Sequence, residues 1–138
     1  MEIRGTGSYL PGKIITNDDL SEVVDTNDEW ISSRTGICQR HISEGETTSE
    51  MAAKAAVAAL EDAEVSPEEV ELIIVATMTG DEAMPGTACK VQKEIGAVHA
   101  ACFDLSAACT GFVFALNTAN AYLASGMYRN ALVIGADM

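Results

Sequence analysis

An uncharged stretch from Leu105 to Tyr128 restricts the possible folds of this chain more than any other feature. A helix with so little charge has to pack against protein or lie in a membrane. Polar side chains interrupt the stretch too often for a membrane span, at Ser106, Thr110, Asn117, Thr118, Asn120 and Ser125. We therefore expect a buried helix of a water-soluble protein, running from Cys109 to Ala124.

Cys109 stands at the expected start of this helix, after an apolar segment that ends at Leu105. A thiol at a helix N-terminus meets the positive end of the helix dipole and unpaired backbone N–H groups. Both favour the thiolate, which is the nucleophilic form of cysteine. The alternative is a buried structural cysteine, a common fate for a free thiol. We predict that Cys109 is a nucleophile, and that the small Gly111 lets neighbouring backbone approach the helix start.

Strands and helices alternate through the second part of the chain. Thr47 and Glu50 have the spacing of a capping box, which predicts a helix from there to about Ala63. The continuous apolar run 72–76 is typical of a strand buried on both faces. The other elements expected here are a helix that opens at Pro85-Gly86 and runs to Ile95, and strands at 100–105 and 131–136. The alternation indicates an α/β fold with a largely parallel sheet covered on both faces.

The first part of the chain predicts smaller elements joined by polar loops. Asn17 and Asn27 are the expected N-caps of two short helices, and Gly36 follows the end of the second. The expected elements are a strand at 2–10, helices at 18–24 and 28–33, and an extended piece at 37–42.

Trp30 and Arg34 lie four residues apart, so a helix would place them on one face. That spacing allows a flat base to lie between the indole and the guanidinium. The alternative is a tryptophan that anchors the loop to the core, with Arg34 paired to an acidic neighbour.

Composition excludes several classes of function. The net charge of −13 makes nucleic acid an unexpected partner, because phosphate binding needs a basic surface. The four cysteines, Cys38, Cys89, Cys102 and Cys109, have irregular spacing without a C-x-x-C pair, so neither zinc nor a disulfide framework is expected. The N-terminus has no apolar signal core, and we expect a reducing, cytoplasmic compartment. Apart from Cys109, the cysteines are expected to be thiols without chemistry.

Several segments together resemble a known family. They are Gly5-Thr6-Gly7-Ser8-Tyr9-Leu10-Pro11, Thr26-Asn27-Asp28-Glu29-Trp30-Ile31, Arg34-Thr35-Gly36-Ile37, Arg40-His41-Ile42 and Asp104-Leu105-Ser106-Ala107-Ala108-Cys109-Thr110-Gly111-Phe112. The sequence is similar to the 3-oxoacyl-acyl-carrier-protein synthases III, which are thiolase-like condensing enzymes. The resemblance covers the N-terminal half of the family's usual length. It implies a five-layer αβαβα fold with a mostly parallel mixed sheet. Residues 1–138 would form the N-terminal half-domain of this fold, with the C-terminal half absent. The resemblance also implies that the enzyme is a homodimer.

The resemblance also implies an activity, the start of fatty acid synthesis. An acyl group, with acetyl-coenzyme A as the expected donor, moves to Cys109, and the acyl-enzyme condenses with malonyl-acyl carrier protein while carbon dioxide is lost. No cofactor is implied beyond the coenzyme A thioester substrate. By the same resemblance Trp30, Arg34 and Thr26 grip the adenine end of coenzyme A, and Met84 lines the acyl pocket of the dimer partner.

Two further interpretations of the same sequence stay open. The family's catalytic histidine and asparagine belong to its second half and are not in this sequence, and neither His41 nor His99 sits in the family's histidine motif. Condensation by this chain alone is therefore not expected. One alternative is a non-catalytic half-fold that dimerises or binds a partner. The other is a related condensing enzyme, of secondary metabolism or for 3-hydroxy-3-methylglutaryl-coenzyme A.

Overall fold

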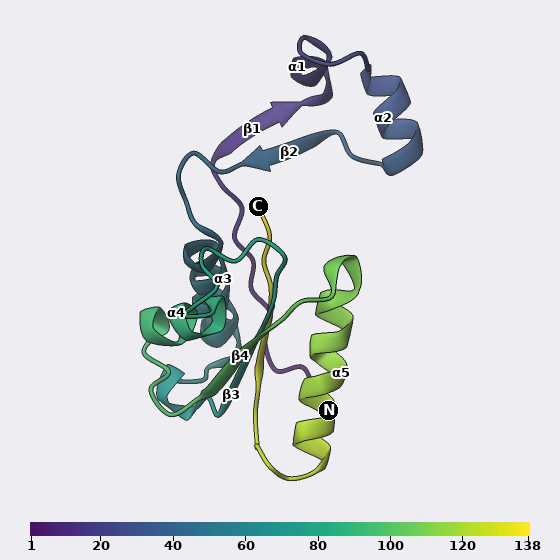
Figure 1. Ribbon diagram of the computed structural model, residues 1–138. Helices are drawn as coiled ribbons and strands as arrows, with labels where there is room; N and C mark the ends of the chain where they lie inside the picture. Colours follow the sequence, from purple (N-terminus) through teal and green to yellow (C-terminus); the bar gives the residue numbers. More distant parts are fainter. The chain divides into compact units, whose positions relative to one another are not determined.

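The computed structural model describes residues 1–138 and divides the chain into two compact units (Figure 1). The first unit combines Met1–Tyr9 with Thr47–Met138, and the second is Leu10–Glu46.

The first unit is built on a three-stranded parallel sheet with the strand order β4-β3-β5. Strand β3, Leu72–Ala76, lies in the centre, between β4, Ala101–Leu105, and β5, Leu132–Gly135. Leu72 pairs with Ala101 on one side, and Ile73 pairs with Leu132 on the other. The predicted parallel sheet is therefore confirmed, with strand ends within a residue of their expected positions.

Helices cover both faces of this sheet, as Figure 1 shows. On one face lie α3, Thr48–Ala63, and α4, Thr87–Ile95, and on the other lies α5, Gly111–Ala124. Short 3-10 turns, η1 (Pro67–Glu69) and η2 (Ala108–Thr110), precede β3 and α5.

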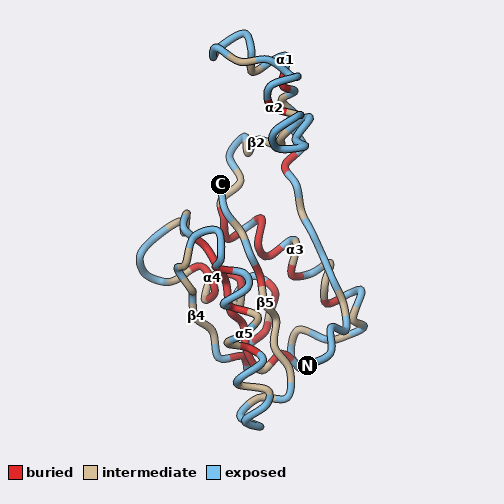
Figure 2. The backbone as a smooth tube through the Cα atoms, turned by 90° about the vertical axis from the view of Figure 1, so that its right-hand side faces the viewer, coloured by how far each residue is buried: buried red, intermediate tan, exposed pale blue.

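Strand β3 forms the centre of both cores, and all five of its residues are buried. Because side chains alternate along a strand, Ile73 and Val75 pack with α3 and α4, whereas Leu72, Ile74 and Ala76 pack with α5. Figure 2 shows buried residues in red through the sheet and along α3. The predicted strand buried on both faces is confirmed.

Helix α5 is less buried than the sequence predicted. Its small residues Gly111, Ala115 and Ala119 are buried on the sheet. The apolar residues of its first turn, Phe112, Val113 and Phe114, are exposed. The helix is therefore covered on one side only within residues 1–138, and the expectation of a buried helix was wrong for the other side. None of the helices is long and apolar enough to cross a membrane.

The predicted strand at 2–10 was wrong, because none of these residues pairs in a sheet. Residues 5–9 lie along α3 instead. The N–H of Thr6 donates to Asp62 at 2.8 Å. A Cβ on Gly7 would stand 2.3 Å from both the Ala55 carbonyl oxygen and the Ala59 nitrogen. Glycine thus lets the segment run directly over the helix backbone.

The second unit is a two-stranded antiparallel ribbon with two short helices. Strand β1, Lys13–Thr16, pairs with β2, Gln39–Ile42, which confirms the extended piece expected at 37–42. Between them lie α1, Asn17–Ser21, and α2, Asp28–Thr35. Helix α2 has Asn27 as its N-cap and Gly36 as its C-cap, as predicted.

Asn17 holds this unit together, although the sequence predicted it as a helix cap. Thr16 caps α1 instead, with its side chain accepting from the Asp19 N–H. Buried Asn17 donates to Asp28 and to the Ile37 carbonyl, both at 2.7 Å. It also accepts from Arg40 at 2.9 Å, so one amide joins both helices to β2.

The close approach of Gly7 to α3 generates a stability prediction. Gly7→Ala should lower the free energy of unfolding by about 1–3 kcal/mol, because the added carbon overlaps helix backbone that cannot move aside. Urea denaturation measures the change. The control is Gly12→Ala, where no atom lies within 4 Å of the added carbon. Equal stability of the two variants would contradict the packing of this segment on α3.

Candidate active site

The carboxyl ends of three parallel strands meet at one edge of the first unit. In parallel α/β sheets this edge is where ligands bind. Asp137, two residues after β5, accepts from the Met78 N–H at 2.7 Å and from the Thr77 and Thr79 hydroxyls at 3.2 and 3.3 Å. These bonds tie the loop after β3 to the end of β5, and so give the edge a defined shape.

Cys109 lies at this edge, in the η2 turn between β4 and α5. Its side chain is exposed, and neither its sulfur nor its backbone N–H makes a hydrogen bond within the chain. The preceding Ala108 has φ +46, a left-handed conformation that costs a non-glycine residue about 1–3 kcal/mol and is concentrated at functional sites. The helix proper begins at Gly111, so Cys109 precedes it rather than opening it.

Two glycines let this turn pack closely on the sheet. A Cβ on Gly111 would lie 3.3 Å from the Ala76 side chain at the end of β3. One on Gly135 would lie 3.2 Å from the Phe112 ring. At Gly111 the approaching group is the Ala76 side chain, whereas neighbouring backbone was expected.

Asp104 has a structural role that the sequence analysis missed. Its carboxylate accepts from the backbone N–H groups of Thr87 and Ala88, at 2.7 and 2.6 Å. Helix α4 lacks a side-chain cap of its own, because Gly86 stands at its N-cap. Asp104 supplies that cap from a neighbouring strand. No local signal in the sequence pairs Asp104 with α4, because the two meet only through the packing of α4 on β4.

A half-buried charge cluster fixes the loop between β3 and α4. Burial acts to raise the pKa of Asp81, but hydrogen bonds from Ser49 and Lys90 outweigh it, so the pKa lies below its ordinary value. The Ser49 hydroxyl donates to Asp81 at 2.5 Å, and Lys90 lies 3.3 Å from the same carboxylate. The cluster joins α3, this loop and α4.

Met84 stands on the same loop and is 85% exposed. Its predicted contact would lie across a dimer interface, with a second copy of the chain. The acyl-pocket role of Met84 therefore stays a prediction.

In the second unit, Trp30 and Arg34 lie on one face of α2, as their spacing predicted. The Arg34 guanidinium carbon is 4.7 Å from the centre of the Trp30 ring, and Arg34 forms no salt bridge. A base between them would need two stacking contacts of about 3.5 Å each. Arg34 would therefore have to swing outward. Trp30 is 53% exposed and available for stacking, and Thr26, before the helix, is half-buried.

Neither histidine takes part in the site. His41 Nδ1 lies 2.6 Å from the Pro11 carbonyl oxygen within the second unit. His99 is exposed in the turn before β4. No group of three or more histidine, cysteine or acidic side chains has a geometry that would hold a metal ion.

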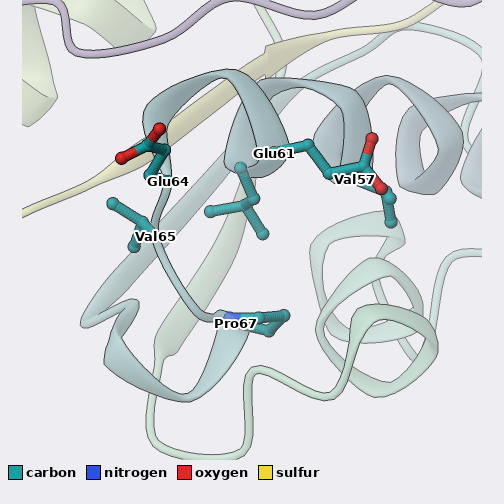
Figure 3. Close-up of a pocket in the computed structure, with 6 residues that line it drawn as sticks. Val57, Glu61, Glu64, Val65 and Pro67 are labelled. Carbon is teal, nitrogen blue, oxygen red and sulfur yellow. The ribbon is translucent and has the colours of Figure 1, made fainter.

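A groove of about 290 Å³ lies elsewhere on the first unit (Figure 3). Its apolar lining includes Val57, Leu60, Val65 and Pro67, with Glu61 and Glu64 beside them. These residues precede β3 and include no cysteine, serine or histidine. The groove is therefore not part of the sheet edge at which Cys109 lies.

Comparisons with known proteins point to one family. The family model of 3-oxoacyl-[acyl-carrier-protein (ACP)] synthase III matches residues 103–138. The beta-ketoacyl-[acyl-carrier-protein] synthase III of Clostridium acetobutylicum is 59% identical over 138 residues, covering 100% of this chain and 42% of that protein. The synthase III of Lactococcus lactis is 54% identical over 137 residues, covering 99% and 42%. The chain thus spans less than half the length of these curated relatives.

Solved structures agree with the sequence comparisons. The crystal structure of 3-oxoacyl-[acyl-carrier-protein] synthase III from Aquifex aeolicus matches with a TM-score of 0.95 and 51% identity, over 99% of this chain and 44% of that one. The priming beta-ketosynthase of the R1128 polyketide pathway matches with a TM-score of 0.94 and 40% identity, over 99% and 41%. The expected thiolase-like α/β layered fold is confirmed, as is the match to only part of the family's length.

The capping role of Asp104 generates the prediction for this site. Asp104→Asn should lower the free energy of unfolding by about 1–2 kcal/mol, because an amide accepts less well from two N–H groups and carries no charge for the helix dipole. Urea denaturation measures it.

Glu94→Gln is the matched control, since Glu94 is an exposed acid at the other end of α4. Its stability should change by no more than about 0.5 kcal/mol. A loss of the same size in both variants would show that charge alone, and not the cap, is responsible.

Proposed function

We propose that this chain, which is related over its whole length to the 3-oxoacyl-[acyl-carrier-protein] synthases III, is the part of such an enzyme that accepts the acyl group. The main support is Cys109. It is an exposed, unpaired thiol on a strained turn, in the segment that matches the family model. Such a turn presents a nucleophile to substrate ahead of a helix N-terminus.

The first reaction is acyl transfer. The Cys109 thiolate attacks the thioester carbonyl of acyl-coenzyme A, with acetyl-coenzyme A as the expected donor. The free N–H of Cys109 is available to stabilise the oxyanion of the tetrahedral intermediate. Coenzyme A leaves as its thiolate and takes up a proton, and the acyl group remains on the sulfur as a thioester.

The second reaction is the decarboxylative condensation that initiates fatty acid synthesis. Malonyl-acyl carrier protein loses carbon dioxide, and the resulting carbanion attacks the acyl carbon and releases Cys109. The family's histidine and asparagine would assist this step, and they belong to the half of the family's length that residues 1–138 do not span. We therefore assign this chain the acylation step, and assign condensation to the enzyme with both halves.

Coenzyme A would bind through the second unit. A stacked indole and guanidinium offer a flat surface and a local positive charge to an adenine nucleotide. Arg34 is free of acidic partners, and this matters in a chain with a net charge of −13. Thr26 would add a hydroxyl contact. No cofactor beyond the substrate thioester is proposed.

The assembled protein would be a cytoplasmic homodimer in which residues 1–138 form the N-terminal half-domain. Met84 of each subunit would then line the acyl pocket of the other. An unbranched, flexible thioether suits acyl groups of differing length.

A second candidate is an association module without catalysis. The exposed apolar residues of the first turn of α5 favour it, since such a surface promotes protein contacts. This function would leave Cys109 unmodified by thioesters, which distinguishes it from the first.

Acylation of Cys109 is the decisive prediction. We expect acetyl-coenzyme A to add one acetyl group to Cys109, seen by peptide mass spectrometry and removed by hydroxylamine. The chain is assayed alone and with the remaining part of the relatives' length supplied as a separate polypeptide. Cys109→Ser should abolish the adduct.

Cys38→Ser is the matched control, because Cys38 is the other exposed cysteine. It should leave acylation unchanged. If neither sample shows an adduct on Cys109, the association module is favoured. An adduct that persists in Cys109→Ser would refute Cys109 as the acceptor.

Coenzyme A binding has its own readout, because Trp30 is the only tryptophan of the chain. We expect coenzyme A to change its fluorescence. Arg34→Ala should raise the apparent Kd by about two- to thirtyfold, the loss expected for one cation–π contact. Arg4→Ala removes an exposed arginine paired with Glu2 and is the control for charge. Equal weakening in both variants would contradict a specific role for Arg34.

A further inference from the structure

Two cysteines outside the candidate active site contact each other. Cys89, in the first turn of α4, and Cys102, on β4, have their sulfurs 3.4 Å apart. The Cys102 thiol also lies 3.3 Å from the Gln92 side-chain oxygen. Both cysteines are half-buried, so each residue keeps part of its surface in contact with solvent. Their sequence separation gave no sign of this contact.

Polar contacts on either side hold the two sulfurs in place. On one side, Asp104 binds the first N–H groups of α4. On the other, the Gln92 side chain donates to the Ala100 carbonyl at 2.6 Å. Helix α4 is thus hydrogen-bonded to β4 and to the residue before it, through α4 residues on both sides of Cys89. Separating the two sulfurs by moving the helix would break these bonds.

We propose that Cys89 and Cys102 form a modification site, a dithiol that a low-molecular-weight disulfide oxidises to an intramolecular disulfide. The Cys89 thiolate attacks one sulfur of the reagent, forms a mixed disulfide and releases one thiol. Cys102 then attacks the Cys89 sulfur of that mixed disulfide and releases the second. Two protein thiols are oxidised and one reagent disulfide is reduced to two thiols.

The geometry suits this step. A disulfide bond is about 2.0 Å long, so the sulfurs need to approach by only about 1.4 Å. The bond would join residues 13 apart, and would link the first turn of α4 to the strand that leads to Cys109.

The environment assigns an order to the two thiols. Burial, together with the neighbouring Cys89 sulfur and the Asp104 charge, raises the pKa of Cys102 to about 12. Because the thiolate is the attacking form, Cys102 closes the disulfide rather than opening the reaction. The closing step should accelerate as the pH rises from 7 to 9, because the thiolate fraction of Cys102 increases.

The test uses the full chain with Cys38→Ser and Cys109→Ser, which leaves only the two thiols in question. Oxidised glutathione is the reagent. We expect free thiols to fall from two to none, and the mass of the chain to fall by two hydrogen atoms. Peptide mapping should show Cys89 joined to Cys102. This result does not depend on acyl transfer, because the proposed nucleophile is absent.

Single variants in the same background test the order of reaction. Adding Cys102→Ser should leave glutathione bound on Cys89, whereas adding Cys89→Ser should leave Cys102 as a free thiol. Three results would overturn the proposal. The first two are two bound glutathiones per chain, or cross-linked pairs of chains, in the protein that keeps only Cys89 and Cys102. The third is that Cys89 and Cys102 of this protein stay free under conditions in which Cys38 and Cys109 of the unaltered chain react.

Discussion

The packing of the first turn of α5 against the end of β3 controls the geometry of the candidate site. Gly111 approaches Ala76 so closely that a Cβ would lie 3.3 Å from it. The chain leaving β4 must reach that position within a few residues, and it does so with Ala108 in a left-handed conformation. This strained turn leaves the Cys109 side chain exposed and its N–H unpaired. The exposed thiol therefore lies directly beside the close packing of α5 on β3.

Acidic side chains hold the surrounding loops in place. Asp104, on β4, caps the start of α4. Asp137 accepts hydrogen bonds from the loop after β3. Asp81, on that loop, binds Ser49 of α3 and Lys90 of α4. Each carboxylate accepts from backbone N–H groups, which are favourable partners for a negative charge. In the sequence, the acidic composition made nucleic acid an unexpected partner. In the structure, some of these charges replace the caps and turns that local sequence does not provide.

The thiols show how environment separates residues of one type. Cys109 is exposed and without a partner, whereas Cys102 is half-buried against Cys89 and Gln92. Cys109 was predicted as a nucleophile from its place at an expected helix start, which is a local feature of the sequence. In the structure it is exposed and lies two residues before α5 begins. Cys89 and Cys102 were predicted to be inert, because the contact between a helix and a strand 13 residues away depends on register.

Local signals in the sequence determined many of the elements by themselves. The capping box at Thr47, the N-cap at Asn27 and the apolar run of β3 were each predicted correctly, because each depends on neighbours along the chain. The tertiary structure alone decided that residues 5–9 lie along α3, that one side of α5 stays exposed, and that Asp104 caps a helix. These features depend on which distant segments meet, and residue-by-residue preference carries no information about that.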